Sequence, residues 1–321
     1  MGGPAATATE PMLSGVVVHW HGEEDLAGLL AAWPADPRFE LVVVDNGSGA
    51  PLPEGGFRLV EPGVNLGFAG GANSGVAAAR GPAVLILNPD AHPEPGALER
   101  LLEGLRAHPE AAGLVPRLAD GEGRPQHRWQ LRRLPRPAEL LLSALFVAPP
   151  LGPAREPAAG AAIEQPAAAA LVLRREALLA VGGFDPGYYP AWFEDVDLAR
   201  RLARAGLPLL YWPAAVFRHR LGASVPRLGY GAFLWIYHRN LCRYLARHHG
   251  GAWAGAARAL LVAGMIARLL ALPVRRPRRA RSRREAAAGL LAVAAGAATG
   301  WRRPLTHAAR FAPPAAAEAG P

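Results

Sequence analysis

The sequence contains no lysine, so all 35 of its basic residues are arginines. Its single cysteine, Cys242, excludes an internal disulfide framework and suits a reducing compartment. The N-terminus reads MGGPAATATEPM and lacks the positive and apolar regions of a signal peptide, so we expect a flexible tail over residues 1–11. With 321 residues, the chain can bury a full core in one large domain and still carry an appendage.

Positive charge is concentrated near the C-terminus. The net charge is +9, and seven of the ten residues from Arg275 to Arg284 are arginine. A run of this kind can contact nucleic acid, anionic lipid headgroups or only water. Neither an aromatic platform nor a known nucleic-acid motif accompanies the run, so we expect no nucleic-acid partner.

Strand-like and helix-like segments alternate in the first part of the chain. Short apolar runs predict strands, and the segments between them predict helices. The predicted strands are 13–19, 39–45, 57–60 and 83–90, and the predicted helices are about 23–33 and 96–107. A glycine-rich stretch, 65–75, is expected to lead into a further helix ending at Ala79. This alternation predicts an α/β fold with a mainly parallel, doubly wound sheet.

The second part of the chain is less regular. Residues 119–166 are rich in Pro, Arg and Ala, and they predict a mobile excursion over the sheet edge with a short helix near 138–147. Order is expected to return with strands at 167–174 and 207–217, a helical segment over REALLAV, and a helix from Glu194 to Gly206.

A carboxylate ends one of the predicted strands. The run AVLILNPD reads as a strand buried on both faces that Pro89 stops, leaving Asp90 at its carboxyl end. Ligands of open α/β sheets bind at that end. A carboxylate there, with no lysine in the chain to pair with it, suits a divalent metal that carries phosphate oxygens. The same pattern also suits a turn-initiating or helix-capping Asp, and the run alone does not separate these hypotheses.

A second group of acids opens the helix predicted from Glu194. Asp195 shares its helical phase with apolar residues, so we expect it to point inward, where the helix N-terminus keeps it ionised. An ionised, oriented carboxylate suits a general base, although an N-cap Asp would look the same. Asp197 is in phase with Arg200, Arg201 and Arg204, which predicts an exposed, salt-bridged face.

Two apolar stretches, 252–272 and 286–300, flank the arginine run. Each is near or below the roughly 20 residues that span a bilayer, and Arg258 and Arg268 would be costly inside one. We therefore expect a helical hairpin that lies on an anionic membrane surface. The competing hypothesis is a pair of helices packed on the rest of the chain or on a second subunit.

Six phrases occur together in one order: VVVDNGS (42–48), NLGFAGGANSG (65–75), LNPD (87–90), PGALERLL (95–102), RREALLAVGGFD (174–185) and FEDVDLARRLARAG (193–206). In this order and spacing the chain resembles the family 2 inverting glycosyltransferases, especially the rhamnosyltransferase-like branch. The resemblance implies a GT-A type fold. It also implies transfer of rhamnose or a similar sugar from a TDP-, UDP- or GDP-linked donor.

The resemblance also assigns roles to residues. Asp195 matches the catalytic base, Asp90 is the last acid of the metal-binding motif, and His219 matches a histidine that can complete the metal site. The implied metal is Mg²⁺ or Mn²⁺. The implied donor-binding residues are Asp45, which would hold the base or ribose, and Asn65, Gly67, Gly70, Asn73 and Asn88. The phrase His19-Trp20-His21 departs from the family's Asn-Tyr-Asn-like phrase, and His92 could approach the metal or be exposed.

These observations predict a GT-A domain over 12–225, a helical, membrane-associating region over 226–303 and a flexible tail over 304–321. We expect the protein at the cytoplasmic face of the cell membrane, with a lipid-linked or cell-envelope glycan as acceptor. Two carboxylates could also suggest a glycoside hydrolase, and the glycine-rich stretch a dinucleotide-binding oxidoreductase, although its spacing is not G-x-G-x-x-G. The alternative hypothesis is a catalytically decayed transferase domain that binds glycan or nucleotide at the membrane.

Overall fold

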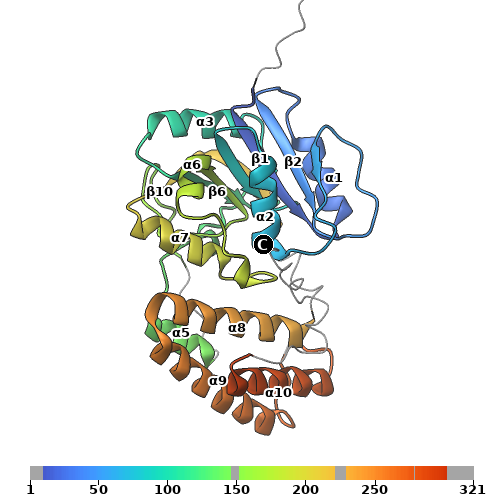
Figure 1. Ribbon diagram of the computed structural model, residues 1–321, viewed down its shortest axis with the longest axis vertical. Helices are drawn as coiled ribbons and strands as arrows, with labels where there is room; N and C mark the ends of the chain where they lie inside the picture. Colours follow the sequence, from blue (N-terminus) through green and yellow to red (C-terminus); the bar gives the residue numbers. More distant parts are fainter. Residues whose placement is uncertain (1–9, 146–151, 221–228, 278, 302–321) are drawn as a thin grey trace, which may run out of the picture.

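The computed structural model describes residues 10–145, 152–220, 229–277 and 279–301. An α/β region holds the sheet and the helices on its two faces, and a layer of helices lies beneath it (Figure 1). We call this second part the helical layer. Most of the two predicted tails, and the end of the helix predicted near 138–147, lie outside the described residues.

The α/β region has the predicted alternation of strands and helices. Its strands are β1 (Leu13–His19), β2 (Phe39–Asp45), β3 (Arg58–Val60), β4 (Ala83–Leu87), β5 (Ala91–Pro93), β6 (Gly113–Ala119), β7 (Leu131–Arg132), β8 (Gln165–Pro166), β9 (Ala170–Arg174) and β10 (Leu209–His219). Its helices are α1 (Glu23–Ala32), α2 (Gly67–Ala78), α3 (Ala97–Ala107), α4 (His127–Gln130), α6 (Arg175–Ala180), the 3-10 turn η1 (Pro186–Tyr188) and α7 (Glu194–Arg204). The sequence pattern did not reveal β6, because Pro116 and Arg117 interrupt its apolar run.

Within the described residues the strands form an eight-stranded sheet in the order β3-β2-β1-β4-β9-β6-β10-β5, and β7 pairs with β8 separately. The pairs β1–β2, β1–β4, β2–β3 and β6–β10 are parallel, whereas β9 and β5 run antiparallel to their neighbours. The α/β class is confirmed, but the sheet is mixed. The chain leaves β6 and enters β9 at the same end of the strands, so β9 runs antiparallel between β4 and β6.

Helices cover both faces of the sheet. On one face, leucines of α1 and α3 pack against the strands in one apolar core. On the other face, α2, α6 and α7 pack against the alternate side chains of the same strands in a second core. The strands place every second residue on each face, which is why central strands such as β4 are apolar throughout. Burial on both faces holds the carboxyl ends of β1, β2 and β4 rigid.

The glycine-rich stretch differs from its prediction. It was expected to be a loop that leads into a helix, but it forms the body of α2 from Gly67 onward. A Cβ on Gly71 would lie 2.8 Å from Val18, and one on Gly75 would lie 2.3 Å from Val16. The glycines therefore let α2 lie close against β1, so they are not the phosphate-binding loop that a dinucleotide-binding enzyme would need.

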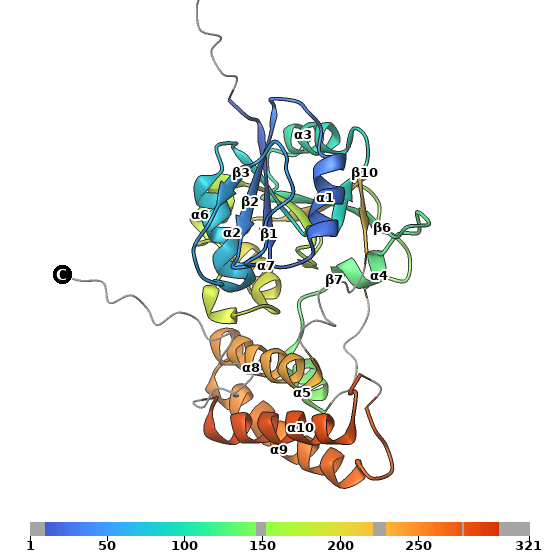
Figure 2. The ribbon, with the colours of Figure 1, turned by 90° about the vertical axis from the view of Figure 1, so that its right-hand side faces the viewer.

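The helical layer consists of α5 (Pro137–Ala144), α8 (Tyr230–His249), α9 (Gly251–Ala271) and α10 (Arg283–Thr299). Its apolar core is shared with the α/β region, because Tyr188, Phe193 and Val196 pack into it (Figures 1 and 2). The two predicted C-terminal helices are thus confirmed as α9 and α10. The boundary at residue 226 stays a prediction.

Helix α9 is long and apolar enough to cross a membrane, by length and composition alone. In its most apolar stretch of 18 residues, 28% is buried inside the protein. Its two arginines have partners inside the protein. Arg258 donates to the carbonyl oxygen of Ala297, and Arg268 donates to that of Leu145. The polar cost that argued against a spanning helix is therefore offset here by contacts with neighbouring segments.

Candidate active site

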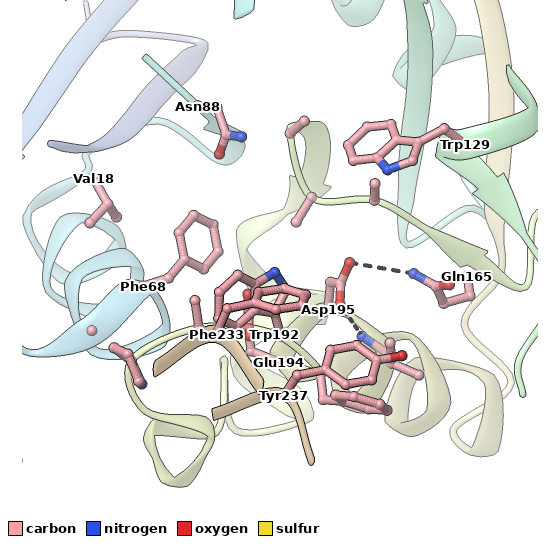
Figure 3. A pocket seen from close by; sticks show the side chains of 18 of the residues that line it. Val18, Phe68, Asn88, Trp129, Gln165, Trp192, Glu194, Asp195, Phe233 and Tyr237 are labelled. Carbon is pink, nitrogen blue, oxygen red and sulfur yellow. Dashed lines mark hydrogen bonds between the residues drawn. The ribbon is translucent and has the colours of Figure 1, made fainter. Parts of the chain in front are cut away.

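A cavity of about 940 Å³ lies where the carboxyl ends of β1, β2 and β4 meet the start of α7. The residues that line it on the α/β side include Val18, Asn46, Asn65, Gly67, Phe68, Asn88, Asp90, Trp129, Gln165, Glu194, Asp195 and His219. Aromatic residues of α8 close the opposite wall (Figure 3). The cavity therefore brings together Asp90, Asp195 and His219, which are far apart in the sequence.

Asp195 points into this cavity, as its helical phase predicted (Figure 3). Its Oδ1 accepts a hydrogen bond from its neighbour, the backbone N–H of Val196, at 2.8 Å. Its Oδ2 lies 3.4 Å from the amide nitrogen of Gln165 and 3.9 Å from a guanidinium nitrogen of Arg132. The side chain is 16% exposed. Burial raises its pKa, and the Arg132 charge and backbone N–H groups oppose that rise.

Glu194 lies beside Asp195 and is buried. Burial and the charge of Asp195 raise the pKa of Glu194 well above its ordinary value, so Glu194 holds a proton more readily than an isolated glutamate does. Its Oε2 has no hydrogen-bond partner among the described residues. The two residues before it, Trp192 and Phe193, have φ angles of 72° and 75°, a left-handed conformation that side chains rarely adopt. Such backbone strain clusters at functional sites.

Asp90 and His219 face each other at the other end of the cavity. Asp90 Oδ1 lies 3.7 Å from His219 Nε2, and the His219 Nδ1 lies 2.8 Å from the Gln126 Oε1. Burial, with the nearby Asp25 charge, raises the pKa of Asp90 to about 6, and burial lowers the pKa of His219 to about 4. Near neutral pH the pair is therefore a carboxylate and a neutral imidazole.

Asp90 and His219 together fit a divalent cation whose remaining ligands come from a substrate and from water. A metal-binding imidazole is usually oriented by a hydrogen bond at its other nitrogen, and Gln126 is placed to provide one. Within the described part of the chain, no group of three or more His, Cys, Asp or Glu side chains could hold a metal. Mg²⁺ is usually bound through one or two carboxylates together with substrate phosphate oxygens and water, and Asp90 is the carboxylate of this pair.

The predicted donor-binding residues fall into two groups. Asn65, Gly67 and Asn88 line the cavity. Asp45 does not line it, but its Oδ1 accepts from the Ser48 N–H and so shapes the turn that follows β2. Asn46, which sequence analysis did not single out, does line the cavity, and its side-chain amide donates to Asn65 Oδ1 at 3.1 Å. The VVVDNGS phrase contained this signal.

Two predicted donor-binding residues lie away from the cavity. The Asn73 amide is occupied by the backbone of Phe184, to which it donates at 2.8 Å and from which it accepts at 2.9 Å. Gly70 lies within α2, where a Cβ would contact Leu66. Asn73 therefore joins α2 to the segment at Phe184. His92 likewise has a structural place, because its Nε2 lies 3.1 Å from the carbonyl oxygens of Asp25 and Pro89.

The prediction that Asp197 lies on an exposed face of α7 is wrong. This carboxylate is fully buried, because α8 packs over it. It accepts from Arg201 Nε at 2.7 Å, lies 2.7 Å from His248 Nε2, and pairs with Arg247 at 3.1 Å. The (i, i+4) pair with Arg201 was expected, but the partners from α8 could not be seen in the local sequence pattern. Asp197 therefore joins the two regions.

Comparisons with known proteins agree with this site. Residues 23–153 match the family model "Glycosyl transferase family 2". The chain is 29% identical over 261 residues to the N-acetylglucosaminyl-diphospho-decaprenol L-rhamnosyltransferase of Mycobacterium tuberculosis, covering 74% of this chain and 84% of that protein. The chain is therefore similar to the rhamnosyltransferase-like glycosyltransferases of family 2. It is also 32% identical over 190 residues to the pre-mycofactocin glycosyltransferase of the same species, which covers 56% of this chain and 37% of that one.

Solved glycosyltransferases share the fold. GalNAc-T7 with UDP, GalNAc and Mn²⁺ aligns with a TM-score of 0.52 at 15% identity, over 74% of this chain and 48% of that one. The mannosyltransferase PcManGT from Pyrobaculum calidifontis, in complex with GDP-Man and Mn²⁺, aligns with a TM-score of 0.51 at 19% identity, over 90% and 87%. The GT-A type α/β fold predicted for this glycosyltransferase is thereby confirmed.

Proposed function

We propose that this glycosyltransferase moves rhamnose or a similar sugar from a nucleotide diphosphate donor to a hydroxyl of a lipid-linked glycan, with inversion. The observation that carries the proposal is the single cavity into which Asp195 points and which Asn65, Asn88 and Asp90 also line. The M. tuberculosis rhamnosyltransferase supports the choice of sugar and of a lipid diphosphate acceptor. Although Asp45 does not line the cavity and its Oδ1 binds the Ser48 N–H, its other carboxylate oxygen would hold the nucleotide beside Asn65 and Gly67.

In the proposed mechanism Asp195 takes the proton of the acceptor hydroxyl. The acceptor oxygen attacks the anomeric carbon as the bond from that carbon to the diphosphate oxygen breaks, and this single displacement inverts the configuration. Asp195 is suited to the task because Arg132 and Gln165 orient it and because Glu194 keeps the second proton of the pair. Asp90 and His219 would hold Mg²⁺ or Mn²⁺, which, when bound, offsets the charge of the departing diphosphate.

We also propose that the helical layer holds the enzyme at the cytoplasmic face of the membrane. Its surface carries large exposed apolar side chains close to the arginine run, namely Ile266, Leu270, Val274 and Leu291. Leu270 is 77% exposed and Val274 is 90% exposed. Apolar side chains that insert at the interface, flanked by arginines that attract anionic headgroups, are typical of a membrane-surface helix.

The test is a donor screen with the purified full chain. TDP-, UDP- and GDP-linked sugars are offered with a prenyl-diphosphate N-acetylglucosamine acceptor, and released nucleoside diphosphate and product mass are measured. We expect release that depends on the acceptor and on Mg²⁺ or Mn²⁺ and that stops with a chelator. Asp90→Asn should stay inactive after metal is restored, because the amide is a poor replacement for a charged ligand.

A matched control is Asp120→Asn, since Asp120 pairs with Arg124 and does not line the cavity. It should leave turnover unchanged. Donor binding without transfer to any acceptor would contradict the proposal and favour the hypothesis of a catalytically decayed domain.

A further inference from the structure

The wall of the cavity that α8 builds is aromatic. Phe233 and Tyr237 lie one turn apart on α8 with their rings stacked at 6.0 Å, and Trp192 meets Phe233 edge-on at 5.0 Å. Figure 3 shows these three side chains beside Asp195, across the cavity from Asn88 and Val18. The wall thus presents flat apolar rings to whatever approaches Asp195 from the side opposite the proposed donor site.

An arginine of the basic run reaches the same wall. The Arg279 guanidinium carbon lies 5.6 Å from the centre of the Phe233 ring, and Arg279 lines the cavity while remaining exposed to solvent. The other two arginines of the cavity face carboxylates, Arg133 at Glu139 and Arg132 at Asp195. Within the described residues, Arg279 has neither a salt bridge nor a hydrogen bond. Its guanidinium is therefore available to bind an anionic group of a ligand in the cavity.

The position of Arg279 is built by the fold. The carboxylate of Glu285 accepts from the backbone N–H of Arg281 at 2.6 Å and from that of Tyr230 at 3.3 Å. One acid therefore ties the α9–α10 connection to the first residue of α8. Ser282 caps α10 by accepting from the Glu285 N–H at 3.1 Å. These contacts anchor the segment that carries Arg279 to Tyr230, which lies three residues before Phe233 in the sequence.

We propose that Arg279 binds the diphosphate of a lipid-linked acceptor, whose sugar lies against Phe233 and Tyr237. This inference rests on the proposed function and names the acceptor side of the same site. A guanidinium matches phosphate oxygens in charge and in planar geometry. The attacking hydroxyl must reach Asp195 from the side opposite the donor, and that is where this wall stands. The wall also belongs to the helical layer, whose exposed apolar surface is proposed to meet the membrane that holds the lipid.

Calorimetric titration of the full chain in detergent can test this assignment without turnover. The probes are farnesyl-diphosphate N-acetylglucosamine and octyl N-acetylglucosaminide, which differ by the diphosphate. We expect Arg279→Gln to weaken binding of the diphosphate probe about tenfold, as loss of a charge-assisted contact does, and to change binding of the octyl glycoside less than twofold. Arg284→Gln is the matched control, because Arg284 is exposed in the same run but does not line the cavity. It should change neither affinity.

Three results would overturn the assignment. They are equal affinity of the native chain for both probes, equal losses in the Arg279 and Arg284 variants, and a tenfold loss of affinity for TDP, UDP or GDP in Arg279→Gln. The last result would place Arg279 on the donor diphosphate. The expected selective loss without sugar transfer by the native chain would support the acceptor assignment while contradicting the proposed function.

Discussion

The chain up to residue 225, which holds the α/β region and α5, and the chain after it, which holds the rest of the helical layer, carry opposite net charge. Residues 12–225 hold 23 acids against 19 arginines, whereas residues 226–303 hold 15 arginines and a single acid, Glu285. The two charges meet where the regions join. Asp185 pairs with Arg243 at 2.9 Å and with Arg247 at 3.0 Å. The difference teaches that part of the basic excess, including Arg243 and Arg247, fastens the helical layer to the α/β region, whereas Arg279 faces the cavity.

The two regions also contribute different chemical groups to the cavity. The acids proposed for metal binding and proton transfer belong to strand ends and to α7, and the helical layer adds aromatic rings and Arg279 to the same cavity. We therefore expect changes in the α/β region to stop the reaction. Changes in the helical layer should alter what reaches the site or how the chain meets the membrane.

The largest effect is expected from Asp195→Asn. An amide cannot accept the acceptor proton, so kcat should fall about a thousandfold while donor affinity changes little, as loss of a general base predicts. The measurements are single-turnover rates with a verified acceptor and donor binding by calorimetry. Asp120→Asn again serves as the control. Near-native turnover of Asp195→Asn would show that another group takes the proton.

Asp197→Asn tests the junction between the regions. It leaves Arg201, Arg247 and His248 without their carboxylate, and breaking a buried charged pair costs about 3 kcal/mol of unfolding free energy. Although burial alone would raise the pKa of Asp197, the His248 and Arg201 contacts lower it overall. Its contribution to stability is therefore present above the unfolded pKa and is lost as the pH falls through the lowered folded pKa.

Urea unfolding followed by tryptophan fluorescence measures this effect. The difference between the native chain and Asp197→Asn should be full at pH 7 and should shrink below about pH 3.8, the ordinary pKa of Asp. Equal stability at pH 7 would show that the buried cluster does not join the regions.

Features that depend on neighbouring residues were predicted from the sequence better than features that depend on distant segments. Strands β1, β2 and β4 and the inward direction of Asp195 followed from local apolar patterns, which repeat within a few residues. The reversal of β9, the partners of Asp197 from α8 and the approach of Arg279 to Phe233 depend on contacts between distant segments. The short helix predicted near 138–147 is present as α5, but no local period records contacts between distant segments, so the β7–β8 pair and the cavity wall on α8 could be found only in the structure.

Membrane contact is expected to change by a smaller factor. Replacing Leu270 and Val274 together by Asp should reduce co-sedimentation with anionic liposomes several-fold, because exposed apolar area and nearby positive field are both weakened. Leu179→Asp is the matched control, since Leu179 is 55% exposed on α6 in the other region. Binding that remains should weaken with salt. Equal binding of all three chains would contradict the proposed membrane face.

The smallest effect is expected from Glu194→Gln. Because burial raises the pKa of Asp195, activity should be lost as the pH falls through a value above the ordinary 3.8, the point at which the base becomes protonated. The pKa of Glu194 is raised well above its ordinary value, so we expect Glu194 to be neutral at that pH, and a neutral glutamine then leaves the charge around Asp195 unchanged. We therefore expect kcat within about threefold of native and the acidic limb of the pH–rate profile at the same pH. A limb shifted to lower pH by about one unit would show that Glu194 carries charge while Asp195 titrates, and that the proton is shared between them.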